Sequence, residues 1–271
     1  MTGSFKFRAA YFLAASAPEP WIIAASSGNF GQALALACSM LGKGCTIVMP
    51  DSSAAVKIAA VRDYGAEVEL IDVRRVSRAA RVAQLAEDRP GCRVASAYDD
   101  DQVIAGNATL GAEIAAFAPR PDIVVAPVGG GGLTAGLVQA LGAQAPGVEV
   151  VGAEPLLGND AARSLRSGRL LANDEEPATL ADGARTVSLG ERNWAILRHG
   201  LAGIVEVPEV QIREAVRLLF SMANVKSEPT GALAIGALLA DPGRFLGRRV
   251  CCVVSGGNVD PAAYAEIITG D

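Results

Sequence analysis

The stretch Asp122-Ile123-Val124-Val125-Ala126-Pro127-Val128-Gly129-Gly130-Gly131-Gly132-Leu133 joins an apolar run of strand length to four consecutive glycines. A run this apolar indicates a strand buried on both faces of a parallel sheet. The helical pattern that opens at Leu133 places the glycines in a strand–helix turn, where several N–H groups and the helix dipole can converge on an anion. The spacing fits neither a P-loop nor a dinucleotide fingerprint. The stretch therefore predicts an α/β fold with a site for a single phosphate group, and a tight turn without a ligand is the alternative.

The alternation of apolar strands and helical patterns continues on both sides of this stretch. Short β-branched runs predict strands over residues 21–25, 45–50, 66–71, 93–95, 122–128, 149–154, 204–207 and 249–255. Between them, apolar periodicity predicts helices over residues 30–41, 53–64, 77–88, 105–117, 133–141, 210–222 and 231–239. Residues 157–190 are the least regular stretch, polar and interrupted by Gly and Pro. This order predicts parallel twisted sheets flanked by helices.

Composition and charge exclude several classes of protein. With 51% hydrophobic residues over 271 positions, the chain can bury a large core, which excludes disordered and fibrous proteins. The net charge of −5 includes no basic cluster and no apolar run approaches a membrane span, so neither nucleic acid nor a membrane is an expected partner. Five cysteines without CxxC spacing indicate reduced thiols and a cytoplasmic protein. His199 is the single histidine, which argues against Ser-His-Asp triads and multi-histidine zinc sites.

Two further turns and one lysine are candidates for chemistry. The turns Ser26-Ser27-Gly28-Asn29 and Ser255-Gly256-Gly257-Asn258 each follow a predicted strand, at the edge where open α/β sheets bind ligands. Together with the four glycines, these two turns predict a single cleft lined by backbone amides. Lys6 lies between Phe5 and Phe7, and neighbours that exclude water favour the neutral amine, which forms Schiff bases. Taken alone, Lys6 also fits a solvated lysine, and the serines fit helix caps.

Four segments of the chain, taken in order, resemble the fold type II pyridoxal-phosphate enzymes: residues 4–10, 26–32, 128–133 and 255–258. Within that fold type they are most similar to the branch of threonine/serine dehydratases and serine racemase, over essentially the whole chain. The resemblance implies a two-domain, tryptophan synthase β-like α/β fold. A small domain of residues 21–98 would be inserted into a large cofactor-binding domain of residues 1–20 and 99–271, with pyridoxal 5'-phosphate between them.

The resemblance also implies roles for the motifs in binding this cofactor. Lys6 would bind it covalently and move protons on one of its faces, and the four glycines would hold its phosphate. Asn29 would hydrogen-bond its phenolic oxygen and Ser255 its pyridine nitrogen. Glu228 matches a position beside the cofactor, although an acid at a helix start is the alternative. The implied cofactor-binding set is Phe5, Lys6, Asn29, Gly129, Gly130, Gly131, Gly132, Leu133, Glu228 and Ser255.

For the substrate, the resemblance points to the turn after the first predicted strand. Its backbone amides and hydroxyls would bind the substrate carboxylate at a helix N-terminus. Ser27 matches the serine that faces the cofactor opposite the lysine in racemases, so it joins Lys6 as a catalytic candidate. Phe30 stands where many relatives carry histidine, which is expected to alter substrate preference. The implied substrate-binding residues are Ser26, Ser27, Gly28 and Asn29.

A looser resemblance concerns a metal ion. Glu154, Asp160 and the carbonyl of Gly158 match the divalent-metal site of this branch. Carboxylate and carbonyl oxygens are the ligands that Mg²⁺ or Ca²⁺ prefer. A solvated loop that carries two acids is the equal alternative.

The reaction that the resemblance implies is β-elimination of water from serine or threonine, which gives a 2-oxo acid and ammonia. A pyridoxal-phosphate-dependent serine/threonine dehydratase is therefore the expected activity, with serine racemase or 3-hydroxyaspartate dehydratase as alternatives. Relatives carry several dozen residues before the lysine motif, which begins here at Thr2. A truncated non-catalytic fragment or pseudoenzyme is accordingly the alternative of another class. The expected partners are an amino-acid substrate and, as in relatives, a second copy of the chain in a homodimer.

Overall fold

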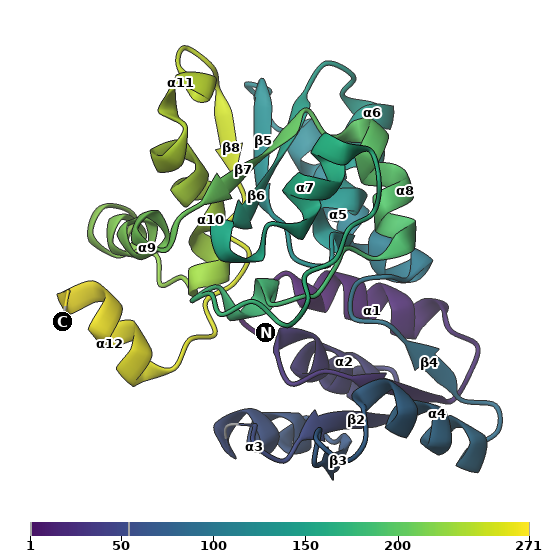
Figure 1. The fold of residues 1–271 in the computed structure, drawn as a ribbon. Helices are drawn as coiled ribbons and strands as arrows, with labels where there is room; N and C mark the ends of the chain where they lie inside the picture. Colours follow the sequence, from purple (N-terminus) through teal and green to yellow (C-terminus); the bar gives the residue numbers. More distant parts are fainter. Residues whose placement is uncertain (1, 54, 271) are drawn as a thin grey trace. The chain divides into compact units, whose positions relative to one another are not determined.

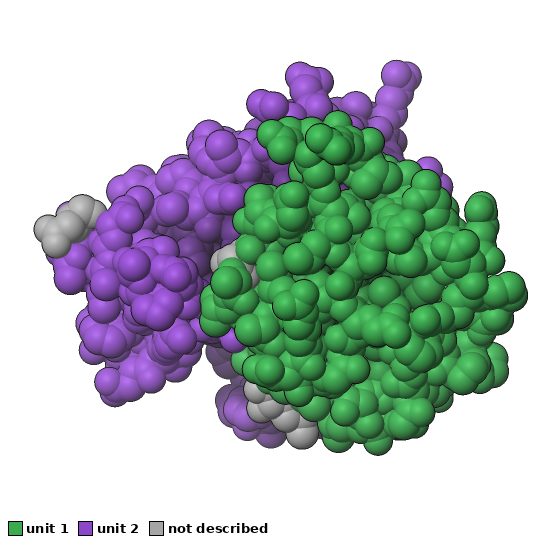
Figure 2. All heavy atoms as spheres, turned by 90° about the horizontal axis from the view of Figure 1, so that it is seen from below, with its two compact units in different colours: residues 1–106 green, residues 107–271 purple. Residues whose placement is uncertain are grey.

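The computed structural model describes residues 2–53 and 55–270, whose helices and strands are drawn in Figure 1. Its contacts divide the chain into two compact units, Met1–Gly106 and Asn107–Asp271 (Figure 2). Residue 54 of the predicted helix 53–64 lies outside the described residues, as do the terminal residues 1 and 271 of the predicted large domain. The predicted division, 21–98 against 1–20 with 99–271, stays a prediction.

Unit 1 contains a parallel sheet whose strands follow the order β3-β2-β1-β4. On one face, Ile22 of β1 packs with Leu34 of helix α2, and on the other face Ile23 packs with Val82 of helix α4. Because successive strand residues point to opposite faces, burial on both sides explains why the strand is apolar throughout. The elements are α1 (Lys6–Ser16), β1 (Trp21–Ala25), α2 (Asn29–Met40), β2 (Gly44–Pro50), α3 (Ala55–Asp63), β3 (Glu67–Ile71), α4 (Arg78–Asp88) and β4 (Arg93–Ala95).

Helix α1 is absent from the sequence-based prediction. Phe5 at its N-cap provides no side-chain cap, and its alanines give little contrast between an apolar and a polar face. Its buried residues, among them Ala9 and Leu13, pack in the same cluster as residues of α2. A Cβ atom at Gly106 would lie 2.8 Å from the Cα of Ala9, so glycine allows a close backbone approach there. Tertiary packing, more than local sequence, stabilises this helix.

Unit 2 contains a second parallel sheet, in the order β7-β6-β5-β8. Val125 and Val151 of its central strands pack against Leu233 of helix α10. In the described residues, each of the eight predicted strands is present, which confirms the predicted α/β fold with parallel sheets. The elements are α5 (Asp101–Ala116), which spans the boundary between the units, β5 (Ile123–Pro127), α6 (Gly132–Gln144), β6 (Glu149–Pro155), α7 (Asp160–Ser167), α8 (Glu191–Gly200), β7 (Gly203–Val207), α9 (Glu209–Ala223), α10 (Pro229–Ala240), α11 (Pro242–Phe245), β8 (Val250–Cys252) and α12 (Pro261–Thr269).

The stretch predicted to be irregular, residues 157–190, contains helix α7 and a long connecting segment. This connecting segment (residues 168–190) carries one short 3₁₀ turn, Asp182–Ala184, and a single bridge between Ala172 and Ser188. It joins α7 to α8, and α8 was not predicted either. Among the described residues, no helix combines the length and the apolar character needed to cross a membrane.

Candidate functional site

Lys6, the first residue of α1, holds its amino group in a partly apolar setting. Its Nζ donates a hydrogen bond of 3.0 Å to the carbonyl of Ala97. The same nitrogen lies 5.0 Å from the ring centroid of Phe5 and 5.9 Å from that of Phe30. Phe7, the other sequence neighbour, packs against Tyr11 instead. The predicted aromatic surroundings are thus confirmed for Phe5, and Phe30 supplies the second ring.

The turn between β1 and α2 is shaped by the side chain of Ser26. Its Oγ accepts hydrogen bonds from the N–H groups of Gly28 (3.3 Å) and Gly31 (3.0 Å), so this hydroxyl caps the helix. A Cβ atom at Gly31 would lie 2.8 Å from the Ser26 carbonyl, which requires glycine at that position. Ser27 and Asn29 are half-buried in the same turn. For Ser26 the structure therefore shows the capping role, and its predicted contact with substrate stays a prediction.

In unit 2 the four glycines form the turn from β5 into α6, as predicted. Gly131 has φ +89°, a conformation that residues with a side chain rarely adopt. A Cβ atom there would lie 2.8 Å from Cδ2 of Leu189, and one at Gly129 would lie 3.0 Å from Cα of Ala184. The connecting segment therefore packs directly on the glycines. The first N–H groups of a helix lack intrahelical acceptors, so this buried turn presents donors suited to an anion.

Ser255 is at the same sheet edge as the glycine turn. Strand β8 pairs in parallel with β5, and the N–H of Val253, just after β8, donates to the carbonyl of Val125 (2.9 Å). The segments that follow β5 and β8 therefore leave the sheet next to each other. Ser255 is buried, and the next carbonyl, of Gly256, accepts a hydrogen bond from the N–H of Glu228 (3.0 Å). The predicted position Glu228 is thus a buried residue at the start of α10. Leu133, in the first turn of α6, is buried as well.

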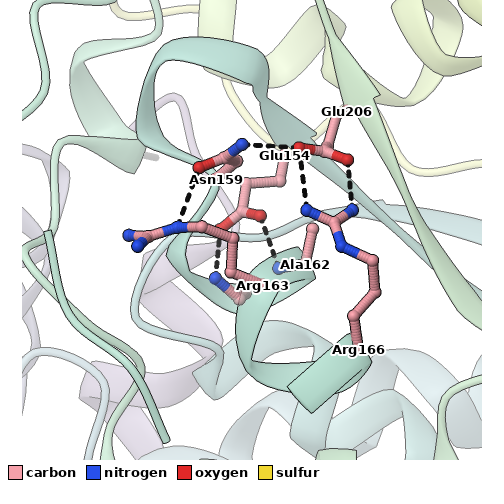
Figure 3. A network of polar contacts seen from close by, with 7 residues as sticks. Glu154, Asn159, Ala162, Arg163, Arg166 and Glu206 are labelled. Carbon is pink, nitrogen blue, oxygen red and sulfur yellow. Dashed lines mark hydrogen bonds and ion pairs between the residues drawn. The ribbon is translucent and has the colours of Figure 1, made fainter.

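The predicted metal ligands Glu154 and Asp160 lie on β6 and at the start of α7, and both are buried. The carboxylate of Glu154 accepts hydrogen bonds from the N–H groups of Ala161 (2.9 Å) and Ala162 (2.8 Å), which caps α7 (Figure 3). Burial, together with the nearby charge of Asp160, raises the pKa of Glu154 well above its ordinary value. Burial also raises the pKa of Asp160 to about 7. The described residues contain no group of three or more His, Cys, Asp or Glu side chains placed to hold a metal ion.

A polar network around these acids ties α7 to its neighbours. Asn159 donates to Glu206 of β7 (2.6 Å) and accepts from Arg163 (3.1 Å), while Arg166 pairs with Glu206 (Figure 3). The guanidinium of Arg166 lowers the pKa of Glu206. Asp160 accepts hydrogen bonds from the connecting segment near both of its ends, namely from Asn173 Nδ2 (3.0 Å) and from the N–H of Leu189 (3.1 Å). Asp160 therefore holds in place the segment that covers the glycine turn.

Two residues that support the glycine turn were not predicted from the sequence. Asn193 of α8 is buried, and its amide Nδ2 donates to the carbonyl of Gly130 at 2.6 Å. Thr230, at the start of α10, accepts a hydrogen bond from the N–H of Gly183 (2.9 Å) in the connecting segment. Both contacts involve backbone groups distant in sequence, so no local pattern marks them. Thr230 could have been found only through its place beside Glu228.

Comparison with known proteins places the chain among enzymes of one family. A protein-family model described as "Pyridoxal-phosphate dependent enzyme" matches residues 1–256. The "L-threo-3-hydroxyaspartate ammonia-lyase" of Pseudomonas sp is 36% identical, over 99% of this chain and 85% of the relative. A crystal structure of the T.th. threonine deaminase has a TM-score of 0.90 and 43% identity, covering 96% of this chain and 85% of that one. Serine racemase from Dictyostelium discoideum has a TM-score of 0.89 and 32% identity, with 96% and 84% covered.

Proposed function

Because the chain belongs to the pyridoxal-phosphate-dependent enzymes, we propose that it is an ammonia-lyase acting on a 3-hydroxy amino acid, serine or threonine. The reaction would eliminate the β-hydroxyl as water and release a 2-oxo acid and ammonia. The observation that carries the proposal is the shielded amine of Lys6, hydrogen-bonded to Ala97 and flanked by Phe5 and Phe30. The names of the three relatives support this class of substrate.

The residues present fit the cofactor of this family. The glycine turn packs so closely on α8 and the connecting segment that a Cβ atom at Gly129 or Gly131 would overlap neighbouring atoms. The turn also presents backbone N–H donors of the kind that bind phosphate. When bound, pyridoxal phosphate supplies a carbonyl that condenses with amino groups and a ring that withdraws electrons from Cα. Ser255 would then hydrogen-bond the ring nitrogen and Asn29 the phenolic oxygen. Phe5, Leu133 and Glu228 stay proposed neighbours of the cofactor.

In this proposal, groups of the protein bind the cofactor and the substrate and move protons. Lys6 would hold the cofactor and accept the proton from Cα of the substrate. The turn at residues 26–29 would bind the substrate carboxylate through its N–H groups, aided by the dipole of α2. Ser27 would carry a proton on the face opposite Lys6.

Glu154, Asp160 and the Gly158 carbonyl remain the proposed ligands of Mg²⁺ or Ca²⁺. The raised pKa values of both carboxyl groups show that burial disfavours their charged forms, and a divalent cation would offset that penalty. Both carboxylates already accept backbone N–H bonds, which leaves further lone pairs for a cation. Equilibrium dialysis against each cation, with Glu154→Gln as the control, tests this set; equal binding by both proteins would refute it.

Amino-acid turnover tests the proposed activity. The protein saturated with pyridoxal phosphate is expected to release ammonia and a 2-oxo acid in equal amounts from L-serine or L-threonine. L-threo-3-hydroxyaspartate is the second candidate, because the 36% identical relative carries its name. Chiral chromatography of the remaining amino acid would reveal racemisation. Folded, cofactor-loaded protein that forms no 2-oxo acid from any of the three would overturn the proposal, and an inverted amino acid without a 2-oxo acid would show a racemase instead.

The variant Ser27→Ala is expected to lower D-serine formation about 100-fold, and more than it lowers pyruvate formation, because only inversion needs a proton donor opposite Lys6. Ser26→Ala is the matched control. It removes the cap of α2, since Ser26 accepts from Gly28 and Gly31, and should cost about 1 kcal/mol of stability without changing the product ratio. If both products fall equally in Ser27→Ala, Ser27 acts only on the carboxylate.

A further inference from the structure

We propose that Asn193 is a positioning residue for the phosphate of the cofactor. Its side-chain amide would fix the peptide group between Gly130 and Gly131 so that the N–H of that group faces the phosphate. The inference rests on the proposed function, which assigns the phosphate to the glycine turn. It adds a residue of α8 that none of the sequence motifs contains.

The contact between Asn193 and the turn is short and fully buried. Asn193 has 0% of its surface exposed, and its Nδ2 lies 2.6 Å from the carbonyl oxygen of Gly130. The same oxygen accepts a second hydrogen bond, from the N–H of Gly190 at the N-cap of α8 (3.1 Å). Two donors from the start of one helix therefore hold this carbonyl on the α8 side.

Because the peptide group is planar, the direction of the Gly130 carbonyl also sets the direction of the Gly131 N–H. In a trans peptide the C=O of Gly130 and the N–H of Gly131 lie in one plane and point in opposite directions. Because the carbonyl points to α8, the N–H of Gly131 points away from α8. If the peptide flipped, a carbonyl oxygen would face the phosphate in place of a donor, and like partial charges would repel. Glycines on both sides of this peptide leave no side chain to resist that flip.

The packing around Gly131 closes the side of the turn that faces α8. A Cβ atom at Gly131 would lie 2.8 Å from Cδ2 of Leu189 and 3.0 Å from Cδ1 of Leu197. These apolar side chains close the side toward α8. The anion would therefore lie on the opposite side of the turn, where the N–H of Gly131 points.

Comparison of pyridoxal phosphate with pyridoxal tests this role, because pyridoxal lacks only the phosphate. Dissociation constants for both compounds are measured by equilibrium dialysis with absorbance detection, for the wild-type protein and for Asn193→Ala. The variant is expected to weaken binding of pyridoxal phosphate about tenfold and to leave binding of pyridoxal within twofold of the wild type. Asn193→Asp keeps the shape but removes the donor, and is expected to lose at least as much.

Controls separate this role from a general loss of stability. Trp194→Phe changes the next buried side chain of α8 and should leave the preference for pyridoxal phosphate over pyridoxal unchanged. Thermal melts without cofactor report the stability of each variant, and Asn193→Asp serves if Asn193→Ala does not fold. Equal weakening for both compounds in the Asn193 variants would show a purely structural role and overturn the inference. If the wild type itself binds both compounds equally, the assignment of phosphate to the glycine turn fails instead.

Discussion

Lys6→Ala is expected to abolish 2-oxo acid formation, with a fall of roughly 10⁴-fold or more, because the variant loses the group that holds the cofactor and moves the proton. Its effect on folding should be small. Lys6 is half-buried at the first residue of α1, and the hydrogen bond to Ala97 that the variant loses is worth about 1–3 kcal/mol with a charged donor. Borohydride reduction followed by peptide mass spectrometry should find the cofactor on Lys6 in the wild type and on no residue in the variant.

Lys43→Ala is the matched control for this experiment. Lys43 also lies in unit 1 and also donates to backbone carbonyls, those of Ala17 and Glu19. It should lose similar stability and keep its activity. The chain has four lysines, Lys6, Lys43, Lys57 and Lys226, so the labelled peptide identifies the attachment site without ambiguity. Full activity of Lys6→Ala, or cofactor found on another lysine of the wild-type protein, would refute the assignment.

Central strands such as β1 and β5 could be predicted from the sequence because parallel strands buried on both faces are apolar without interruption. Ile22 and Ile23 face opposite sides of one sheet and both pack in a core, so neither position tolerates a polar residue. Helices such as α8 give a weaker signal. Of its ten residues only Asn193, Trp194 and Leu197 are buried, and one of these three is polar. A single apolar stripe of two residues does not distinguish a helix from a loop.

Some residues of the candidate site could likewise be predicted from the sequence, and others could not. Lys6 and the glycine turn were found because their chemistry depends on residue type and spacing within a few positions. Asn193 and Thr230 were not found, because each contacts a backbone group far away in the sequence. Every residue offers a backbone carbonyl and every residue but proline an N–H, so such contacts cannot be recognised from composition or periodicity. They follow from the path of the connecting segment, which only the folded chain specifies.

Gly131→Ala is expected to lower the free energy of unfolding by about 2–5 kcal/mol and to weaken the binding of pyridoxal phosphate at least tenfold. The left-handed backbone of Gly131 costs a residue with a Cβ atom about 1–2 kcal/mol. The added atom would also lie 2.8 Å from Leu189 and 3.0 Å from Leu197, an overlap that costs about 1–3 kcal/mol. Relief of this overlap requires the ends of the two leucine side chains or the turn itself to move, and a shift of the turn away from α8 would strain the hydrogen bond between Asn193 and Gly130.

Gly168→Ala isolates the backbone contribution to this loss. Gly168 has a similar conformation, φ +70° and ψ 11°, and a Cβ atom there would meet no atom within 4 Å. It should therefore cost no more than about 1–2 kcal/mol in a urea titration and leave cofactor binding unchanged. If Gly131→Ala loses no more stability than Gly168→Ala and binds pyridoxal phosphate as the wild type does, the turn can accept a side chain. Tight packing of α8 and the connecting segment on the glycines would then not be what shapes the phosphate site.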